Sequence, residues 1–137
     1  MRVSLSWLQT YFEAPLPSVT EVAEALTFHA FEIEDVTDAT LEVKVLPDRA
    51  GYALSHRGVA KELSAILDIP MKEDPLRTPL LTNDSTPLLT VSIEDSGCTR
   101  YMGALVQGVV VEPSPAWLQT FLESVGQRSI NNVGLIK

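Results

Sequence analysis

A polar stretch near the middle of the chain, residues 73–87, limits the folds open to these 137 residues. It holds three prolines among charged and hydroxyl side chains. Proline removes a backbone donor and fixes φ, so neither a helix nor a central strand is expected to run through this stretch. We therefore predict a linker at 73–87, a module at residues 1–72 and a second segment at residues 88–137.

Apolar spacing and capping residues predict two helices at the start of the first module. Apolar side chains share one helical face between Trp7 and Phe12, after strand-like residues 3–5. Ser18 and Glu21 have the spacing of a capping box, which predicts a second helix that reaches about Phe28.

The rest of the first module predicts two strands and one more helix. Residues 31–36 and 41–45 alternate apolar and polar side chains, as strands with one wet face do. A turn-rich loop at residues 47–51 follows. Residues 55–67 place apolar side chains on one face and charges on the other, which predicts a helix.

The second segment is expected to add two strands and a helix. Residues 88–95 and 101–112 are rich in Val, Leu and Ile and predict strands. Ser114 followed by Pro115 suggests an N-cap with proline at the first helical position, and Gly126 suits the position after the helix. The order of elements predicts the α+β class.

Composition narrows the functions open to the chain. Ten Lys and Arg residues against eighteen Asp and Glu residues give a net charge of −8, which opposes strong binding of RNA by the chain alone. No apolar run approaches the roughly 18–20 residues of a membrane span, so we expect a soluble, cytoplasmic protein without a membrane partner.

Residues that often carry chemistry are few. One cysteine, Cys98, excludes an internal disulfide, and we expect it to be a partly buried packing residue. His29 and His56 lack neighbouring ligands at zinc-binding spacing, so no metal site is predicted. Helical spacing favours core positions for the aromatic side chains between Trp7 and Phe12 over a surface that stacks bases.

Four segments, taken in order, resemble one family. They are MRVSLSWLQTYFE, EVAEALTFHAFEIEDV, LEVKVLPDRAGYALSHRGVAKELSAIL and CTRYMGALVQGVVVEPSPAWLQTFLESVGQRSINNV. This series resembles the N-terminal part of bacterial phenylalanyl-tRNA synthetase β subunits. The resemblance implies a small helical, winged-helix-like N-terminal module, followed by the start of a mixed α/β editing-type domain.

The resemblance also implies a function and partners. The family's enzyme is a class II aminoacyl-tRNA synthetase of two α and two β chains. It uses ATP and magnesium to join phenylalanine to its tRNA. The α subunit holds the aminoacylation site, and the β subunit supplies assembly surfaces, tRNA contacts and an editing site for wrongly attached tyrosine. We expect this chain itself to bind no cofactor.

The chain departs from the family pattern twice. Many bacterial β subunits insert an oligonucleotide-binding barrel where only residues 37–40 stand here. The family's Asp-x-Thr-Asn-Tyr and Gln-Pro-x-His segments, which supply editing residues, are also absent, since residues 134–137 follow Val133 instead. No catalytic residue is therefore carried over to this chain.

The resemblance leaves five candidate site residues. Asn131 and Asn132 lie closest to the edge of an editing pocket, although adjacent asparagines are more often turn residues. Arg49, Arg57 and Arg100 are candidates for structural roles or for contacts with tRNA.

Two other functions stay open from the sequence. One is a freestanding editing module that hydrolyses mischarged tyrosyl-tRNA, suggested by the second segment. The other is a winged-helix-like module that binds nucleic acid, suggested by the helix-rich first half and opposed by the net charge.

Overall fold

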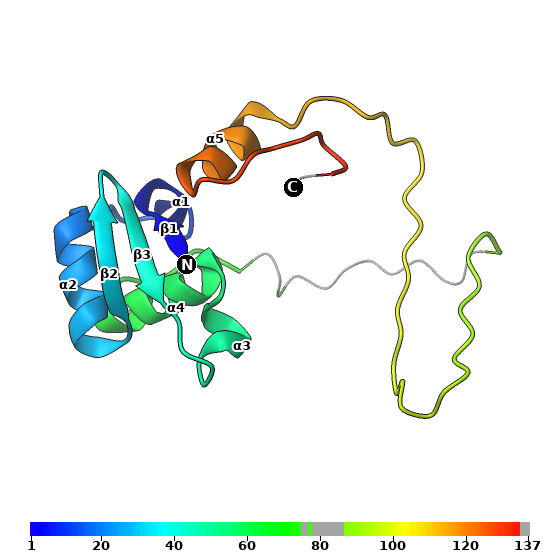
Figure 1. Ribbon diagram of the computed structural model, residues 1–137, viewed down its shortest axis with the longest axis horizontal. Helices are drawn as coiled ribbons and strands as arrows, with labels where there is room; N and C mark the ends of the chain where they lie inside the picture. Colours follow the sequence, from blue (N-terminus) through cyan, green and yellow to red (C-terminus); the bar gives the residue numbers. More distant parts are fainter. Residues whose placement is uncertain (75–76, 78–86, 135–137) are drawn as a thin grey trace.

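The computed structural model describes residues 1–74, 77 and 87–134, and it combines helices with one antiparallel sheet (Figure 1). The sheet has the order β1-β3-β2, with β1 at Arg2–Ser4, β2 at Glu32–Thr37 and β3 at Thr40–Lys44. The helices are α1 Leu5–Gln9, α2 Val19–His29, α3 Ala50–Ala53, α4 His56–Leu67 and α5 Ala116–Ser124. The predicted α+β class is confirmed.

The capping box predicted for α2 is present. The backbone N–H of Glu21 donates to the Ser18 hydroxyl at 3.4 Å, and the Ser18 N–H donates to the Glu21 carboxylate at 2.9 Å. Each side chain thus satisfies a backbone donor that the first turn leaves free. The Ser18 hydroxyl also donates to the Glu21 carboxylate at 2.6 Å, and this bond, followed by the bond from the Ser18 N–H, lowers the pKa of Glu21.

Helix α1 is shorter than the predicted helix. It ends at Gln9, whose side chain accepts the N–H of Leu16 at 2.7 Å and donates to the carbonyl of Ala14 at 2.9 Å. These bonds hold the chain in a turn after α1. Phe12 is therefore outside the helix and forms an isolated bridge with Met71.

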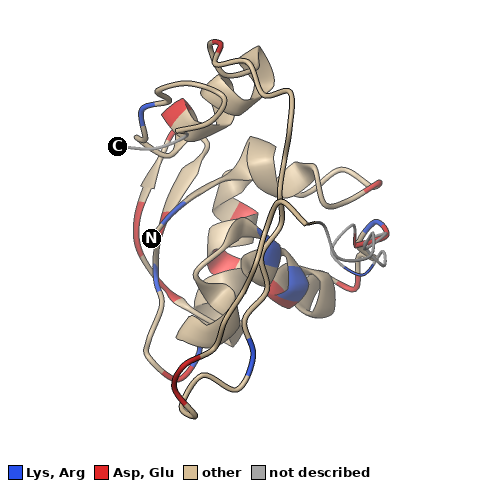
Figure 2. Ribbon diagram, turned by 90° about the vertical axis from the view of Figure 1, so that its right-hand side faces the viewer, with Lys and Arg blue, Asp and Glu red and all other residues tan. Residues whose placement is uncertain are grey.

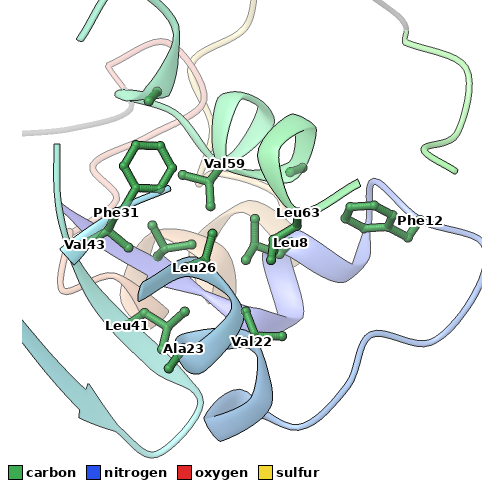
Figure 3. Packing of buried hydrophobic residues seen from close by; sticks show 13 residues of the cluster. Leu8, Phe12, Val22, Ala23, Leu26, Phe31, Leu41, Val43, Val59 and Leu63 are labelled. Carbon is green, nitrogen blue, oxygen red and sulfur yellow. The ribbon is translucent and has the colours of Figure 1, made fainter. Parts of the chain in front are cut away.

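The core of the first module lies between the sheet and α1, α2 and α4 (Figure 3). Its members come from every one of these elements and are at most 7% exposed; they include Val3, Leu8, Phe12, Val22, Leu26, Leu41, Val43, Val59 and Leu63. Burying one such side chain contributes roughly 1.5–3 kcal/mol. Residues distant in sequence thus hold the first module together.

Gly58 lets α4 approach its neighbour closely. A Cβ atom at this position would lie 1.9 Å from the carbonyl oxygen of Tyr52 and 2.9 Å from Cα of Ala53. The tight contact is with the backbone of α3.

Strands β2 and β3 form a direct hairpin. Thr37 pairs with Thr40 across a two-residue turn, and Asp38 takes a positive φ of 52°. A register shift between Ile33 and Asp35 interrupts the simple alternation predicted for β2. The acidic residues of β2 are exposed, as expected.

The strands predicted at residues 88–95 and 101–112 are wrong. Described residues 87–113 contain no strand, and many of their apolar side chains are exposed, among them Leu88, Tyr101, Met102, Val106 and Val110. The two stretches approach each other, since a Cβ on Gly103 would lie 3.0 Å from the side chain of Leu89. A two-stranded pair with neither face covered is marginal in water, and no described element covers it.

Helix α5 returns to the first module (Figure 1). Its N-cap is Pro115 rather than the predicted Ser114, and no side chain caps it. Ser114 is buried and its hydroxyl accepts from Ser129 at 2.6 Å, so it is engaged elsewhere. Gly126 follows the helix with φ of 74°, which confirms the predicted glycine end.

The predicted linker at 73–87 falls largely outside the described residues, so the proposed division at this point stays a prediction. Among the described residues, none of the helices is long and apolar enough to cross a membrane.

Candidate functional site

A cleft of about 970 Å³ lies where the end of α5 meets the first module. It draws on both halves of the chain, and its lining includes Arg2, Trp7, Leu54, His56, Leu122 and Val125. Leu122 is 4% exposed and anchors α5 beside the cleft. The hydroxyl of Thr40 also donates to the carbonyl of Ser124, at 3.2 Å, which fixes the end of α5 to β3.

A stack of aromatic rings forms one side of this junction. The rings of Trp7 and His56 lie 4.1 Å apart at 19°, and those of Trp7 and Phe121 lie 5.3 Å apart at 11°. Trp117 meets Phe121 edge-on at 6.2 Å. The prediction that Trp7 is a core residue is therefore wrong, because it is half-buried at the surface where α5 docks.

His56 is the most perturbed titratable group in this cleft. Its Nε2 accepts the backbone N–H of Ser4 at 3.0 Å, and burial lowers its pKa to about 4. A histidinium has no acceptor nitrogen, so the ring is neutral and carries its proton on Nδ1. The sequence identified His56 only as a histidine without metal-ligand neighbours, and no local pattern indicated that the Ser4 N–H occupies one ring nitrogen.

Charged groups line the β1 side of the cleft. The Met1 ammonium donates to the carbonyl of Val43 at 2.6 Å and pairs with Glu42 at 3.0 Å. Arg2 Nε also donates to Glu42, at 3.2 Å. The hydrogen bond from the Met1 ammonium is the main reason that the pKa of Glu42 is lowered.

Arg57 forms an ion pair at a different place. Its guanidinium binds Asp74 in a two-pronged contact, with Nε at 3.0 and 3.1 Å from the two carboxylate oxygens. Asp74 is 13% exposed and Arg57 28% exposed. This hydrogen bonding raises the pKa of Arg57 and ties the start of the predicted linker to α4.

Arg49 lies in the loop before α3 and makes local contacts. Its guanidinium lies 5.4 Å from the ring centre of the buried Phe31 and 3.6 Å from the Glu62 carboxylate. Tyr52 also connects α3 to α4, because its hydroxyl donates to the carboxylate of Glu62 at 2.5 Å. This hydrogen bond raises the pKa of Tyr52.

The two candidate asparagines form hydrogen bonds with nearby backbone groups, and neither lines the large cleft. The Asn131 carboxamide accepts the N–H groups of Val133 and Gly134 at 2.9 and 2.6 Å, as in a turn. Asn132 contacts the stretch at residues 101–112. Its carboxamide accepts the N–H of Glu112 at 2.9 Å and donates to the carbonyl of Val110 at 2.9 Å. Their assignment to the edge of an editing pocket stays a prediction.

The remaining candidates lie apart from the cleft. Arg100 is exposed in the extended stretch. Cys98 is exposed too, so the expectation of a partly buried cysteine is wrong, because residues 87–113 pack against no core. In the described part of the chain, no group of three or more His, Cys, Asp or Glu residues is arranged to hold a metal ion.

Comparison with known proteins gives the family. The chain is 41% identical over 124 residues to the phenylalanine–tRNA ligase beta subunit of Bdellovibrio bacteriovorus, an alignment that covers 88% of this chain. The chain belongs to the phenylalanine–tRNA ligase beta subunit family. The beta subunits of Moorella thermoacetica and Syntrophotalea carbinolica are 44% and 45% identical to it over 108 and 106 residues, which are 76% and 75% of this chain.

The similarity to these beta subunits is confined to a small part of their length. The three alignments span 14%, 13% and 13% of the relatives. No family model matches the chain, and no solved structure matches it. The family resemblance read from the four sequence segments is confirmed.

Proposed function

We propose that this chain works as part of the β subunit of a phenylalanine–tRNA ligase, where it contributes to subunit assembly and tRNA binding during translation. The observation that carries the proposal is 41% identity across 88% of the chain to a named beta subunit. The folded first module, with its core drawn from distant segments, suits a scaffold role.

The partners proposed from the family are the ligase α subunit, in a heterotetramer of two α and two β chains, and the tRNA for phenylalanine, in the cytoplasm. We propose that the ATP and magnesium used by the assembled enzyme bind outside this chain.

A winged-helix-like architecture is our proposal for residues 1–72. The proposal is supported by a three-stranded antiparallel sheet that packs against helices, and by the direct contact between α2 and α4. Direct nucleic-acid binding by this module alone is less favoured. Over the described residues, acidic and basic positions are scattered along the ribbon, and the chain's net charge is −8 (Figure 2).

A chimera tests the proposed function. The matching segment of the Bdellovibrio bacteriovorus beta subunit is replaced by this chain, and the chimera is produced with its α subunit. We expect assembly and aminoacylation of tRNA with kcat/KM within about tenfold of the parent, since a scaffold segment affects the chemistry indirectly. A Leu8→Asp chimera, which disrupts the core, is the matched control and should fail to assemble. A chimera that folds but binds no α subunit contradicts the proposal.

We further propose that the isolated chain has no catalytic activity. The purified chain should neither charge tRNA with phenylalanine nor hydrolyse tyrosyl-tRNA faster than a buffer blank. Hydrolysis above the blank, lost on substitution of Asn131, Asn132 or His56 by alanine, would instead support the freestanding editing module.

A further inference from the structure

His56 offers an unused hydrogen-bond donor to the cleft beside α5. Because Ser4 N–H occupies Nε2, the ring proton is on Nδ1, and no acceptor among the described residues bonds to it. His56 is only 9% exposed, yet no buried side-chain nitrogen or oxygen of the described residues lacks a partner. Solvent therefore reaches Nδ1. His56 is one of the residues that line the large cleft.

Apolar side chains stand beside this donor. Trp7, Leu54, Leu122 and Val125 all line the cleft, and Leu54 is 60% exposed. Binding sites for small molecules combine apolar walls with a few fixed polar groups in this way. An apolar ligand body would remove the surface of Leu54 from water, which is favourable.

The charge at the cleft favours an anion. Arg2 and the Met1 ammonium supply two positive charges, and Glu42 supplies one negative charge. The Nε of Arg2 donates to Glu42. Its Nη1 lies close to the backbone of Gly126, at 2.7 Å from the position that a Cβ atom on Gly126 would take. A guanidinium with N–H groups to spare is well suited to a carboxylate.

We propose that this cleft binds a small organic monocarboxylate with an apolar body. The carboxylate accepts from His56 Nδ1–H and pairs with Arg2, and the apolar body covers Leu54 and Val125. The site is separate from the proposed role in the ligase and needs none of its partners.

The test uses the full chain at neutral pH, with ¹⁵N-labelled histidine observed by NMR. The probe is 4-methylpentanoate; 4-methylpentanamide has the same body without the charge, and acetate has the charge without the body. We expect a saturable shift of the His56 signals with a Kd of about millimolar, as suits so small a ligand. The amide should bind at least fivefold more weakly and acetate at least tenfold more weakly. The exposed His29 is the internal reference.

A matched pair of variants makes the test specific. Arg2→Gln should weaken binding of 4-methylpentanoate at least fivefold, whereas Arg128→Gln, at another exposed arginine, should leave it unchanged. The ¹⁵N shifts of His56 also report whether each variant keeps the Nδ1–H form and hence the fold. Linear shifts equal to those of His29, equal binding of the amide, or equal effects of the two variants would each overturn the proposal.

Discussion

The backbone N–H of Ser4 donates to Nε2 of His56 at 3.0 Å, and this bond joins β1 to the first turn of α4. The acceptor must be a neutral imidazole, and the bond therefore makes the fold sensitive to pH. The same ring supports Trp7, on which α5 docks. One side chain thus links the sheet, a helix and the second half of the chain.

Stability should fall in mild acid because of His56. Its pKa is about 4 in the folded protein and 6.5 when unperturbed, so the unfolded chain binds more protons between these values. The stabilisation is complete above pH 6.5 and is lost as the pH falls toward 4; at most it amounts to about 3 kcal/mol. Urea unfolding at several pH values measures this. His56→Gln keeps an acceptor near Ser4 without titrating, so its free energy of unfolding should fall less over the same range. Parallel pH profiles for the two proteins would contradict the assignment.

Alanine at Gly58 should destabilise the protein although it favours helix. Propensity alone predicts a gain of about 1 kcal/mol, but the new Cβ would meet the Tyr52 carbonyl oxygen at 1.9 Å. We expect a net loss of about 2–3 kcal/mol in the free energy of unfolding, measured by thermal or urea unfolding. Gly51→Ala is the control, because nothing lies within 4 Å of its Cβ position. Similar effects at the two glycines would show that the close approach is not real.

The Arg57–Asp74 pair should be worth more than a surface ion pair. Its two-pronged geometry and partial burial predict a coupling energy of roughly 1–3 kcal/mol in a double-mutant cycle with Arg57→Met and Asp74→Asn. The exposed pair of Lys44 and Glu32 is the control cycle and should give at most about 1 kcal/mol. Equal coupling energies would remove the case for a structural role of Arg57.

Phe121→Ala should release α5 from the first module while that module stays folded. The change removes the half-buried ring stacked on Trp7, and such an aromatic pair contributes about 0.5–1.5 kcal/mol beyond its buried area. Tryptophan fluorescence should shift to longer wavelength, while amide NMR signals of α2 and β2 keep their dispersion. Thr120→Ala, on the exposed side of α5, should leave the spectrum unchanged. An unaltered spectrum for Phe121→Ala would mean that the stack does not hold α5.

Local sequence signals predicted most of the first module correctly, and the predictions that failed did so because of contacts with residues farther along the chain. The capping box of α2 and the glycine after α5 depend on residues within four positions of each other, so the sequence alone identifies them. The end of α1 was misjudged because the side chain of Gln9 bonds to residues beyond the helix. Apolar periodicity gave Trp7 a core position, although its partners come from α4 and α5.

The strand predictions at 88–95 and 101–112 show the same limit more strongly. Their composition suits strands, but a strand exists only when a neighbour accepts its hydrogen bonds and a core covers its face. Asn132 bonds to the backbone at Val110 and Glu112, a contact across about 20 residues that no local pattern in the sequence indicates.

The amino-acid sequence by itself determined the family, the α+β class and most helices and strands of the first module, because each depends on nearby residues or on an ordered series of motifs. It missed α3, since Ala50–Ala53 fall where residues 47–51 predicted a loop. Only the tertiary structure decided that α5 docks on Trp7, that Ser4 keeps His56 neutral and that a cleft opens between them. The physical reason is that these features join residues from 52 to more than 100 positions apart, and no local pattern of spacing or charge reports which distant surfaces will meet.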